Sequence, residues 1–145
     1  MKFKSEVSVV EELAETAASF VLSWNPGVEF ILPVPPSRLG RPVQPVLLLA
    51  AALGRRMGIP ERPDCIRRVK EVPELKNVYD FPSRVRLLQG AHSVEQAVVE
   101  GKKVLLVDDL FRSGATMNAI TEVLYDQARV TDVFALTITR TRSKR

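Results

Sequence analysis

The first element predicted from the hydrophobic pattern is an amphipathic helix over residues 6–22. Apolar side chains recur there three and four positions apart, with glutamates on the opposite side, which is the spacing of a helix with one buried face. Asn25-Pro26-Gly27 ends it. A second helix, rich in leucine and alanine, is predicted from Pro42 or Pro45 to Met57, because proline suits a first helical turn and Gly58 suits the position after the last.

Four runs of strand-forming residues alternate with the helices. Residues 30–34 and 133–138 are rich in apolar, β-branched and aromatic side chains, and residues 65–69 are a weaker candidate. Residues 104–107 are apolar at every position, as in the central strand of a parallel sheet covered on both faces. A helix over residues 114–127 follows. This alternation predicts an α/β fold with a mainly parallel central sheet flanked by helices.

The pattern breaks down between Lys70 and about Ser93. Prolines interrupt it, and aromatic and basic side chains are scattered through it. Residues 70–93 are therefore predicted to form a flexible loop, and a loop of this length in a compact domain is usually functional or mobile. Residues 94–99 are predicted to form a short helix.

Length and composition narrow the class of protein. The 145 residues suffice for one domain, 1–145, and 46% apolar with 26% charged residues is a globular composition. The single cysteine, Cys65, excludes a disulfide framework and a cysteine-built zinc site within one chain. The lone histidine, His92, is interpreted as structural rather than as a catalytic base. A net charge of +4 permits an anionic ligand or nucleic acid without requiring either.

The apolar runs are too short to cross a membrane. Residues 46–53 are about half the length that a bilayer span needs, and no signal-peptide pattern follows the N-terminal lysines. We therefore expect a cytoplasmic protein with no membrane partner. The basic tail, residues 140–145, is expected to be a solvated chain end.

The segment 104–116 combines an acidic pair with a hydroxyl- and glycine-containing loop. Asp108 and Asp109 follow the buried strand, and ligands bind at the carboxyl ends of such strands. Ser113, Gly114 and Thr116 then open a helix, whose free N–H groups favour an anion. Taken singly, these features only end a strand and cap a helix. Together they predict a sugar phosphate ligand, and the patterns of a P-loop and of a dinucleotide fingerprint are absent.

This segment resembles the phosphoribosyl-diphosphate signature of type I phosphoribosyltransferases. The resemblance implies that fold, and it implies that Asp108 and Asp109 hold the ribose hydroxyls and Mg²⁺, directly or through water. It also implies that the loop surrounds the 5′-phosphate with Arg112, Ser113, Gly114, Ala115 and Thr116. Many members that act on 6-oxopurines carry an aspartate where this chain has Arg112, which argues against a hypoxanthine-guanine enzyme of that type.

A second segment resembles the diphosphate-binding loop of the same family. Residues 33–38 follow the first predicted strand, and the stretch up to Pro60 is most similar to the competence-protein ComF branch. The resemblance implies that Ser37, Arg38 and Arg41 bind diphosphate, with Arg38 joining the aspartates in the catalytic set. Arginine suits this role because its planar fork matches phosphate oxygens. Solvated loop charges are the alternative interpretation.

Residues 84–92 weakly resemble a further ComF pattern. The resemblance implies a mobile flap in this region, from which Lys76 or Arg84 would close onto the diphosphate; an exposed loop with ordinary charges is the alternative. The chain lacks the N-terminal cysteine pairs that give many ComF proteins a zinc ribbon. The acceptor would lie under a small hood, for which the N-terminal segment is the candidate.

The resemblance therefore implies a phosphoribosyltransferase. It would bind 5-phosphoribosyl 1-diphosphate with Mg²⁺ and transfer ribose 5-phosphate to a nitrogenous base or related acceptor, with release of diphosphate. A homodimer is the expected assembly, because family members often dimerise. The alternative is a non-catalytic module that senses phosphoribosyl diphosphate or binds nucleic acid, an idea to which Arg67-Arg68 and the basic tail lend some support.

Overall fold

The computed structural model describes residues 2–24, 26–36, 44–70, 80–111 and 114–140. In chain order the elements are α1 (Lys2–Trp24), β1 (Phe30–Pro33), α2 (Pro45–Met57), β2 (Ile66–Arg68), α3 (Phe81–Leu88), β3 (His92–Val94), α4 (Gln96–Val99), β4 (Lys103–Phe111), α5 (Ala115–Asp126) and β5 (Asp132–Arg140).

The central sheet is parallel, as the sequence predicts. Its strand order is β1-β4-β5, with Phe30 opposite Val104 and Val107 opposite Leu136. All four residues from 104 to 107 are fully buried, because helices cover both faces of the central strand. The segment after α2 also runs beside β1, where the Ile31 N–H donates to the Pro60 carbonyl at 2.9 Å and the Arg62 N–H to the Ile31 carbonyl at 2.9 Å.

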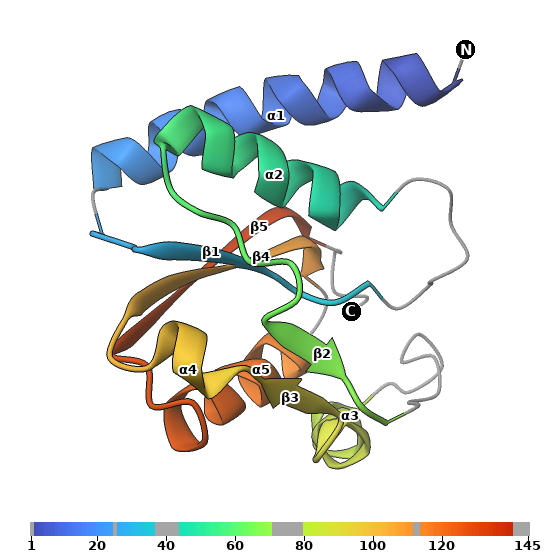
Figure 1. Cartoon of the computed structure of the whole chain (residues 1–145). Coiled ribbons are helices and arrows are strands. Elements are labelled where there is room, and N and C mark those ends of the chain that lie inside the picture. The colour runs from blue at the N-terminus through green and yellow to red at the C-terminus, as the bar shows by residue number, and fades with distance from the viewer. Residues whose placement is uncertain (1, 25, 37–43, 71–79, 112–113, 141–145) are drawn as a thin grey trace.

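Helices form a layer on each face of the sheet (Figure 1). On one face α1 and α2 pack together over a core that includes Ala14, Val21, Leu53 and Leu105. On the other face α5 and α4 pack over a second core, built from Leu32, Val99, Leu106, Ile120 and Leu124 among others. The α/β class with a parallel sheet flanked by helices is therefore confirmed.

The ends of α2 follow local sequence rules. Pro45 stands in its first turn, and Gly58 ends it in the left-handed conformation with φ 67°, which glycine adopts without a steric penalty. Glu11 of α1 accepts hydrogen bonds from Arg55, at 2.5 Å, and from Arg56, at 3.2 Å, near the end of α2. These exposed ion pairs contribute little stability compared with the apolar contacts beneath them.

The prediction of a loop over residues 70–93 is wrong in the described part of that range. Residues 81–88 form α3, and β3 begins at His92 and pairs antiparallel with β2. Asp80 caps α3 by accepting a hydrogen bond from the Ser83 N–H at 2.9 Å, and Pro82 lies in the first turn. Proline is favourable in that turn, so Pro82 lies at the start of a helix and does not interrupt one. The short helix predicted over residues 94–99 is confirmed as the shorter α4.

None of the described helices combines the length and apolar character that crossing a membrane requires.

Candidate functional site

The acidic pair lies at the carboxyl-terminal part of β4, directly after its buried run. The hydrophobic pattern predicts that the strand ends at Asp108 and Asp109, but β4 continues to Phe111. The extension exists because β5 is equally long and pairs with it as far as Phe111 and Arg140. The hydroxyl of Thr139 also donates to the Asp109 carbonyl at 2.8 Å. The two half-buried carboxylates are thus held by a strand rather than by a loop.

The environment of Asp108 disfavours a negative charge. Burial, followed by a hydrogen bond with the Asp109 side chain, raises the pKa of Asp108 to about 7. The backbone N–H groups of Asp109 and Leu110 act in the opposite direction, and the Asp109 N–H donates to Asp108 Oδ1 at 2.8 Å. A carboxylate pair that resists carrying two charges gains from a neighbouring cation or from hydroxyl donors. The pair can therefore hold a diol, a divalent cation or both.

The first turn of α5 supplies backbone donors close to the acidic pair. Gly114 precedes the helix with φ 81°, and a Cβ there would meet the Phe111 ring at 3.0 Å. Gly114, at the N-cap, makes no side-chain capping hydrogen bond, and its carbonyl accepts from the Asn118 N–H at 2.8 Å. Ala115 is buried, and Thr116 adds a half-buried hydroxyl. A helix N-terminus with a glycine at its entrance suits a phosphate group.

The structure brings together part of the predicted site. The Phe111–Gly114 contact connects the strand that carries the aspartates to the helix that begins with Gly114, Ala115 and Thr116. Arg84 lies on α3, a helix packed against α5, and not on the predicted loop. The remaining predicted residues lie outside the described part of the chain: Ser37, Arg38, Arg41, Lys76, Arg112 and Ser113.

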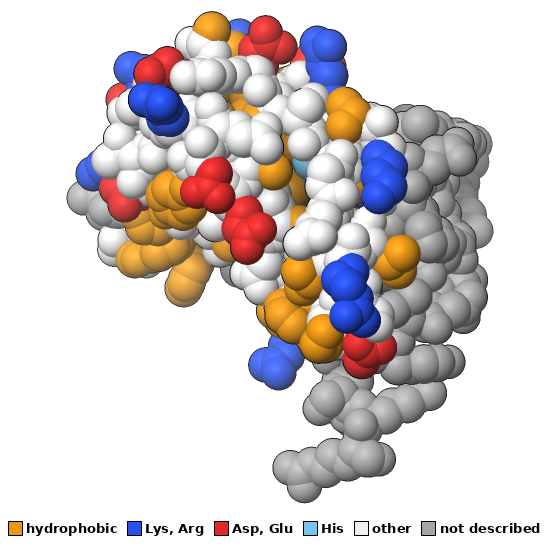
Figure 2. Space-filling model, turned by 90° about the horizontal axis from the view of Figure 1, so that it is seen from below, with side chains coloured by type: hydrophobic (Ala, Val, Ile, Leu, Met, Phe, Trp, Pro, Cys, Tyr) orange, Lys and Arg blue, Asp and Glu red, His pale blue; other side chains and the backbone are white. Residues whose placement is uncertain are grey.

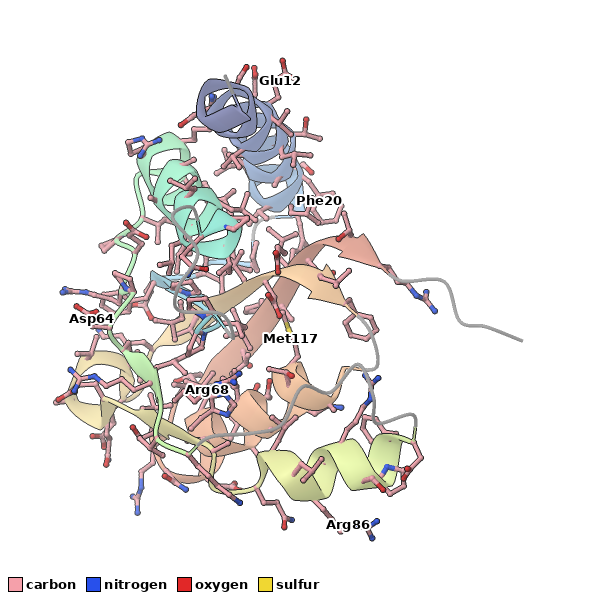
Figure 3. The ribbon with its side chains drawn as sticks, turned by 90° about the vertical axis from the view of Figure 1, so that its right-hand side faces the viewer. Glu12, Phe20, Asp64, Arg68, Arg86 and Met117 are labelled. Atoms are coloured by element: carbon pink, nitrogen blue, oxygen red, sulfur yellow. The ribbon has the colours of Figure 1, made fainter. Side chains whose placement is uncertain are left out.

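Two basic side chains on β2 and β3 were not expected to meet: Arg68, which is partly buried, and His92, which is buried. Arg68 stands opposite His92 in the antiparallel ladder, and in Figure 3 it points from β2 toward α5. Its Nε and both ring nitrogens of His92 are buried without a hydrogen-bond partner among the described residues. The alternation of side chains along a strand could have predicted the inward position of Arg68. Ile66 and Arg68 lie on the inner side of β2, whereas Arg67 is exposed.

His92 is neutral at physiological pH. Its side chain is only 4% exposed, and burial, together with the positive charge of Arg68, lowers the pKa of His92 to about 4. The ring therefore carries no charge and accepts a proton poorly near pH 7. This supports the structural interpretation of the histidine.

The donor set for a metal is limited to carboxylates. Within the described ranges, no three histidine, cysteine, aspartate or glutamate side chains gather at one point. Two half-buried carboxylates nevertheless fit Mg²⁺, which prefers oxygen ligands and usually takes the remainder from substrate and water. The residues present are compatible with a shared metal and substrate site.

The fold is that of type I phosphoribosyltransferases, as solved structures show. Among solved structures, the chain is similar to adenine phosphoribosyltransferase from Saccharomyces cerevisiae, crystallised with adenine and an imino-altritol bisphosphate. The TM-score is 0.64 at 14% identity, covering 92% of this chain and 69% of that one.

Two further solved structures that share this fold are named for different activities. The glutamine phosphoribosylpyrophosphate amidotransferase of B. subtilis matches with TM-score 0.62 and 21% identity, over 90% of this chain and 26% of that one. A hypoxanthine phosphoribosyltransferase from Staphylococcus aureus matches with TM-score 0.54 and 13% identity, over 96% and 70% of the two chains. No protein-family model and no curated protein sequence matches the chain. At such identities the likeness is one of fold.

Proposed function

We propose that this protein is a phosphoribosyltransferase. It would bind 5-phosphoribosyl 1-diphosphate together with Mg²⁺ and transfer ribose 5-phosphate to a nitrogenous base or a related acceptor. The observation that carries the proposal is the juxtaposition of a half-buried carboxylate pair on β4 with the first turn of α5, which Gly114 precedes. Packing alone requires neither feature.

Each part of the substrate has a matching group. Asp108 and Asp109 would accept hydrogen bonds from the ribose hydroxyls, and residues 114–116 would bind the 5′-phosphate through backbone N–H groups and the Thr116 hydroxyl. Arg112 and Ser113 would complete the phosphate loop. Diphosphate would be held by Ser37, Arg38 and Arg41, with Lys76 or Arg84 closing over it. Mg²⁺, when bound by Asp108 and Asp109, would offset the negative charge of the substrate.

The reaction asks little of any side chain as a nucleophile or base. The bond from C1 of the ribose to diphosphate breaks, a bond from C1 to the acceptor nitrogen forms, and the acceptor loses a proton. Catalysis of this kind depends on positioning the two reactants and on stabilising the charge of the leaving group. The rigid seat of the carboxylates on a nine-residue strand supports the positioning role.

The acceptor and the branch of the family are narrower proposals. The solved neighbours act on different acceptors according to their names. Arg112, in place of the aspartate of many 6-oxopurine enzymes, favours an acceptor other than hypoxanthine or guanine. The loop beginning at residue 33 favours the ComF-like branch. A nucleic-acid module has less support, because basic and acidic side chains are interspersed over the described face in Figure 2.

Diphosphate release tests the proposal. The wild-type protein is incubated with phosphoribosyl diphosphate, Mg²⁺ and a panel of purine and pyrimidine bases, alongside Asp109→Asn. We expect release that depends on one of the bases and that falls at least about tenfold in the variant, because a hydrogen bond to a charged group is lost. Tight binding without release from any base would favour the sensing alternative. The absence of both binding and release would contradict the proposal.

A further inference from the structure

The two aspartates of the candidate site are consecutive residues of one strand. In a regular strand, successive side chains point to opposite faces of the sheet. On β4, Leu106 belongs to the core beneath α5, whereas Val107 belongs to the core beneath α1 and α2. If this alternation continued without a break, the carboxylates of Asp108 and Asp109 would lie on opposite faces of the sheet.

The two side chains nevertheless meet. The Asp108 carboxyl is hydrogen-bonded to the Asp109 side chain, and its Oδ1 accepts from the Asp109 N–H at 2.8 Å. Contact between neighbouring side chains requires the strand to depart from regular alternation. The backbone of β4 is therefore turned at Asp109, and this turn is what brings the pair together.

The pairing of β4 with β5 is interrupted at the same residue. The register runs as far as the pair of Asp108 with Thr137 and resumes at Leu110. Within these two described strands, Asp109 is thus skipped. Interruptions of a ladder, most often in the form of bulges, are common beside active sites, where they re-aim a side chain.

The Asp109 carbonyl takes part in this turn. Along β4 the carbonyls of Lys103 and Val107 accept from backbone N–H groups on the β1 side, each at 2.8 Å. Asp109 is the next residue in this alternating series, but β1 pairs with β4 only as far as Val107 in the described chain. The Asp109 carbonyl accepts instead from the Thr139 hydroxyl of β5, at 2.8 Å. A side chain thus supplies a hydrogen bond that the ladder does not.

Two side-chain hydrogen bonds therefore hold the backbone of Asp109, and they respond differently to a ligand. A ribose hydroxyl or Mg²⁺ at Asp108 would compete with the Asp109 N–H for the same carboxylate oxygens. The Thr139 hydroxyl donates to the backbone carbonyl and takes up no carboxylate oxygen. The bond from Thr139 is accordingly the one that persists when the site is occupied.

We propose that Thr139 is a positioning residue, whose hydroxyl holds the Asp109 backbone in the turned conformation that places the Asp108 and Asp109 carboxylates side by side. The inference rests on the proposed function, because the pair is held in this way for the binding of ribose and Mg²⁺. Thr139 acts through Asp109 and does not contact the substrate.

Hydrogen exchange at the Asp109 amide, followed by NMR in the ligand-free protein, tests the contact itself. Thr139→Val removes the hydroxyl and keeps the branched shape, whereas Thr139→Ser keeps the hydroxyl. Thr16→Val is the matched control, because the Thr16 hydroxyl also donates to a backbone carbonyl, that of Glu12 at 3.2 Å on α1. We expect exchange about fivefold faster in Thr139→Val, as for the loss of one ordinary hydrogen bond, and wild-type exchange in the other two variants.

Calorimetric titration with phosphoribosyl diphosphate and Mg²⁺ tests the consequence for the site. We expect binding about fivefold weaker for Thr139→Val, and wild-type affinity for Thr139→Ser and Thr16→Val. All proteins are compared at a temperature at which thermal unfolding shows each to be folded, so that a role in stability alone would leave the affinity unchanged.

The two readouts separate this inference from the proposed function. Unchanged exchange or unchanged affinity in Thr139→Val would overturn the inference, and so would a serine variant as impaired as the valine variant. A wild type that does not bind phosphoribosyl diphosphate would overturn the proposed function, and the exchange rates would then still decide whether Thr139 holds Asp109.

Discussion

At the scale of single residues, burial and the neighbouring Asp109 disfavour a negative charge on Asp108, the residue proposed to contact the ligand. The pH dependence of stability measures this effect in the absence of ligand. Because the folded pKa of Asp108 is raised to about 7, the folded state binds the proton more tightly than the unfolded state does. The contribution to stability is therefore present below the unfolded pKa and is lost as pH rises toward 7. Above pH 7 the ligand-free protein carries the full cost of the ionised carboxylate.

Asp108→Asn is expected to raise the unfolding temperature of the ligand-free protein at pH 8 and to change it less at pH 4. The amide cannot ionise, so the variant does not lose the stability that the ionised Asp108 carboxylate costs the wild type above pH 7. Thermal unfolding followed by circular dichroism at the two pH values measures the difference. Asp126→Asn, at the exposed last residue of α5, serves as the control. A variant that is equally destabilised at both pH values would contradict the assigned cause.

His92 is expected to destabilise the fold in acid. Its folded pKa of about 4 lies below the unfolded value of about 6.5, so the unfolded state gains the proton first. Stability should fall as pH drops from about 6.5 to about 4, by about 3 kcal/mol in total. His92→Phe should remove this part of the acid sensitivity.

Urea unfolding of the wild type and of His92→Phe at pH 7.5 and pH 4.5 provides the measurement. The comparison is made between pH values, so that a packing change which does not depend on pH cancels. An equal loss of stability in both proteins between the two pH values would show that His92 is not the group that titrates.

The residues of the site differ in how far the sequence reveals them. Asp108, Asp109 and Gly114 could be predicted because they are contiguous with a buried strand and a helix start. The burial of Arg68 against His92 could not, because it depends on the pairing of two three-residue strands that are far apart in the chain. The strong effect of burial on Asp108 likewise requires the surrounding fold.

At the scale of elements, local signals predicted α1, α2, α5 and the three parallel strands. The boundaries of β4 and the existence of α3 escaped prediction for different reasons. β4 is lengthened by its pairing with β5, which is a tertiary effect. The signal for α3 was local, but the capping aspartate and first-turn proline were read as loop residues.

The entrance to α5 depends on Gly114. Gly114→Ala should cost more stability than Gly101→Ala, because both positions have φ above 70° but only a Cβ at Gly114 meets a neighbour, the Phe111 ring. The shared left-handed conformation costs about 1–2 kcal/mol in each variant. Gly114→Ala should also weaken phosphate binding, whereas Gly101→Ala should not.

Chemical unfolding of the two glycine variants gives the stability difference, and titration with phosphoribosyl diphosphate gives the binding difference. Equal stabilities of the variants would mean that the Phe111 contact relaxes without cost. Equal affinities of the two variants for phosphoribosyl diphosphate would show that the first turn of α5 is not part of the binding site.

At the scale of the whole molecule, the fold places its chemistry at the carboxyl edge of a parallel sheet, as open α/β sheets do. Most of this chain aligns with 69% of the yeast adenine phosphoribosyltransferase and with 26% of the bacterial amidotransferase. At 21% identity or less this likeness is one of fold. The architecture could be predicted from the sequence because the alternation of strands and helices is written in local hydrophobic patterns. The identity of the acceptor could not be predicted, because the side chains that would bind it follow no such pattern.

The measurement that tests the account most directly is calorimetric titration of phosphoribosyl diphosphate with Mg²⁺ into the wild type, Asp109→Asn and the control Asp126→Asn. The account predicts binding by the wild type and the control, and an affinity about ten- to a hundredfold lower for Asp109→Asn. Equal affinities of all three proteins, or no binding by the wild type, would contradict it.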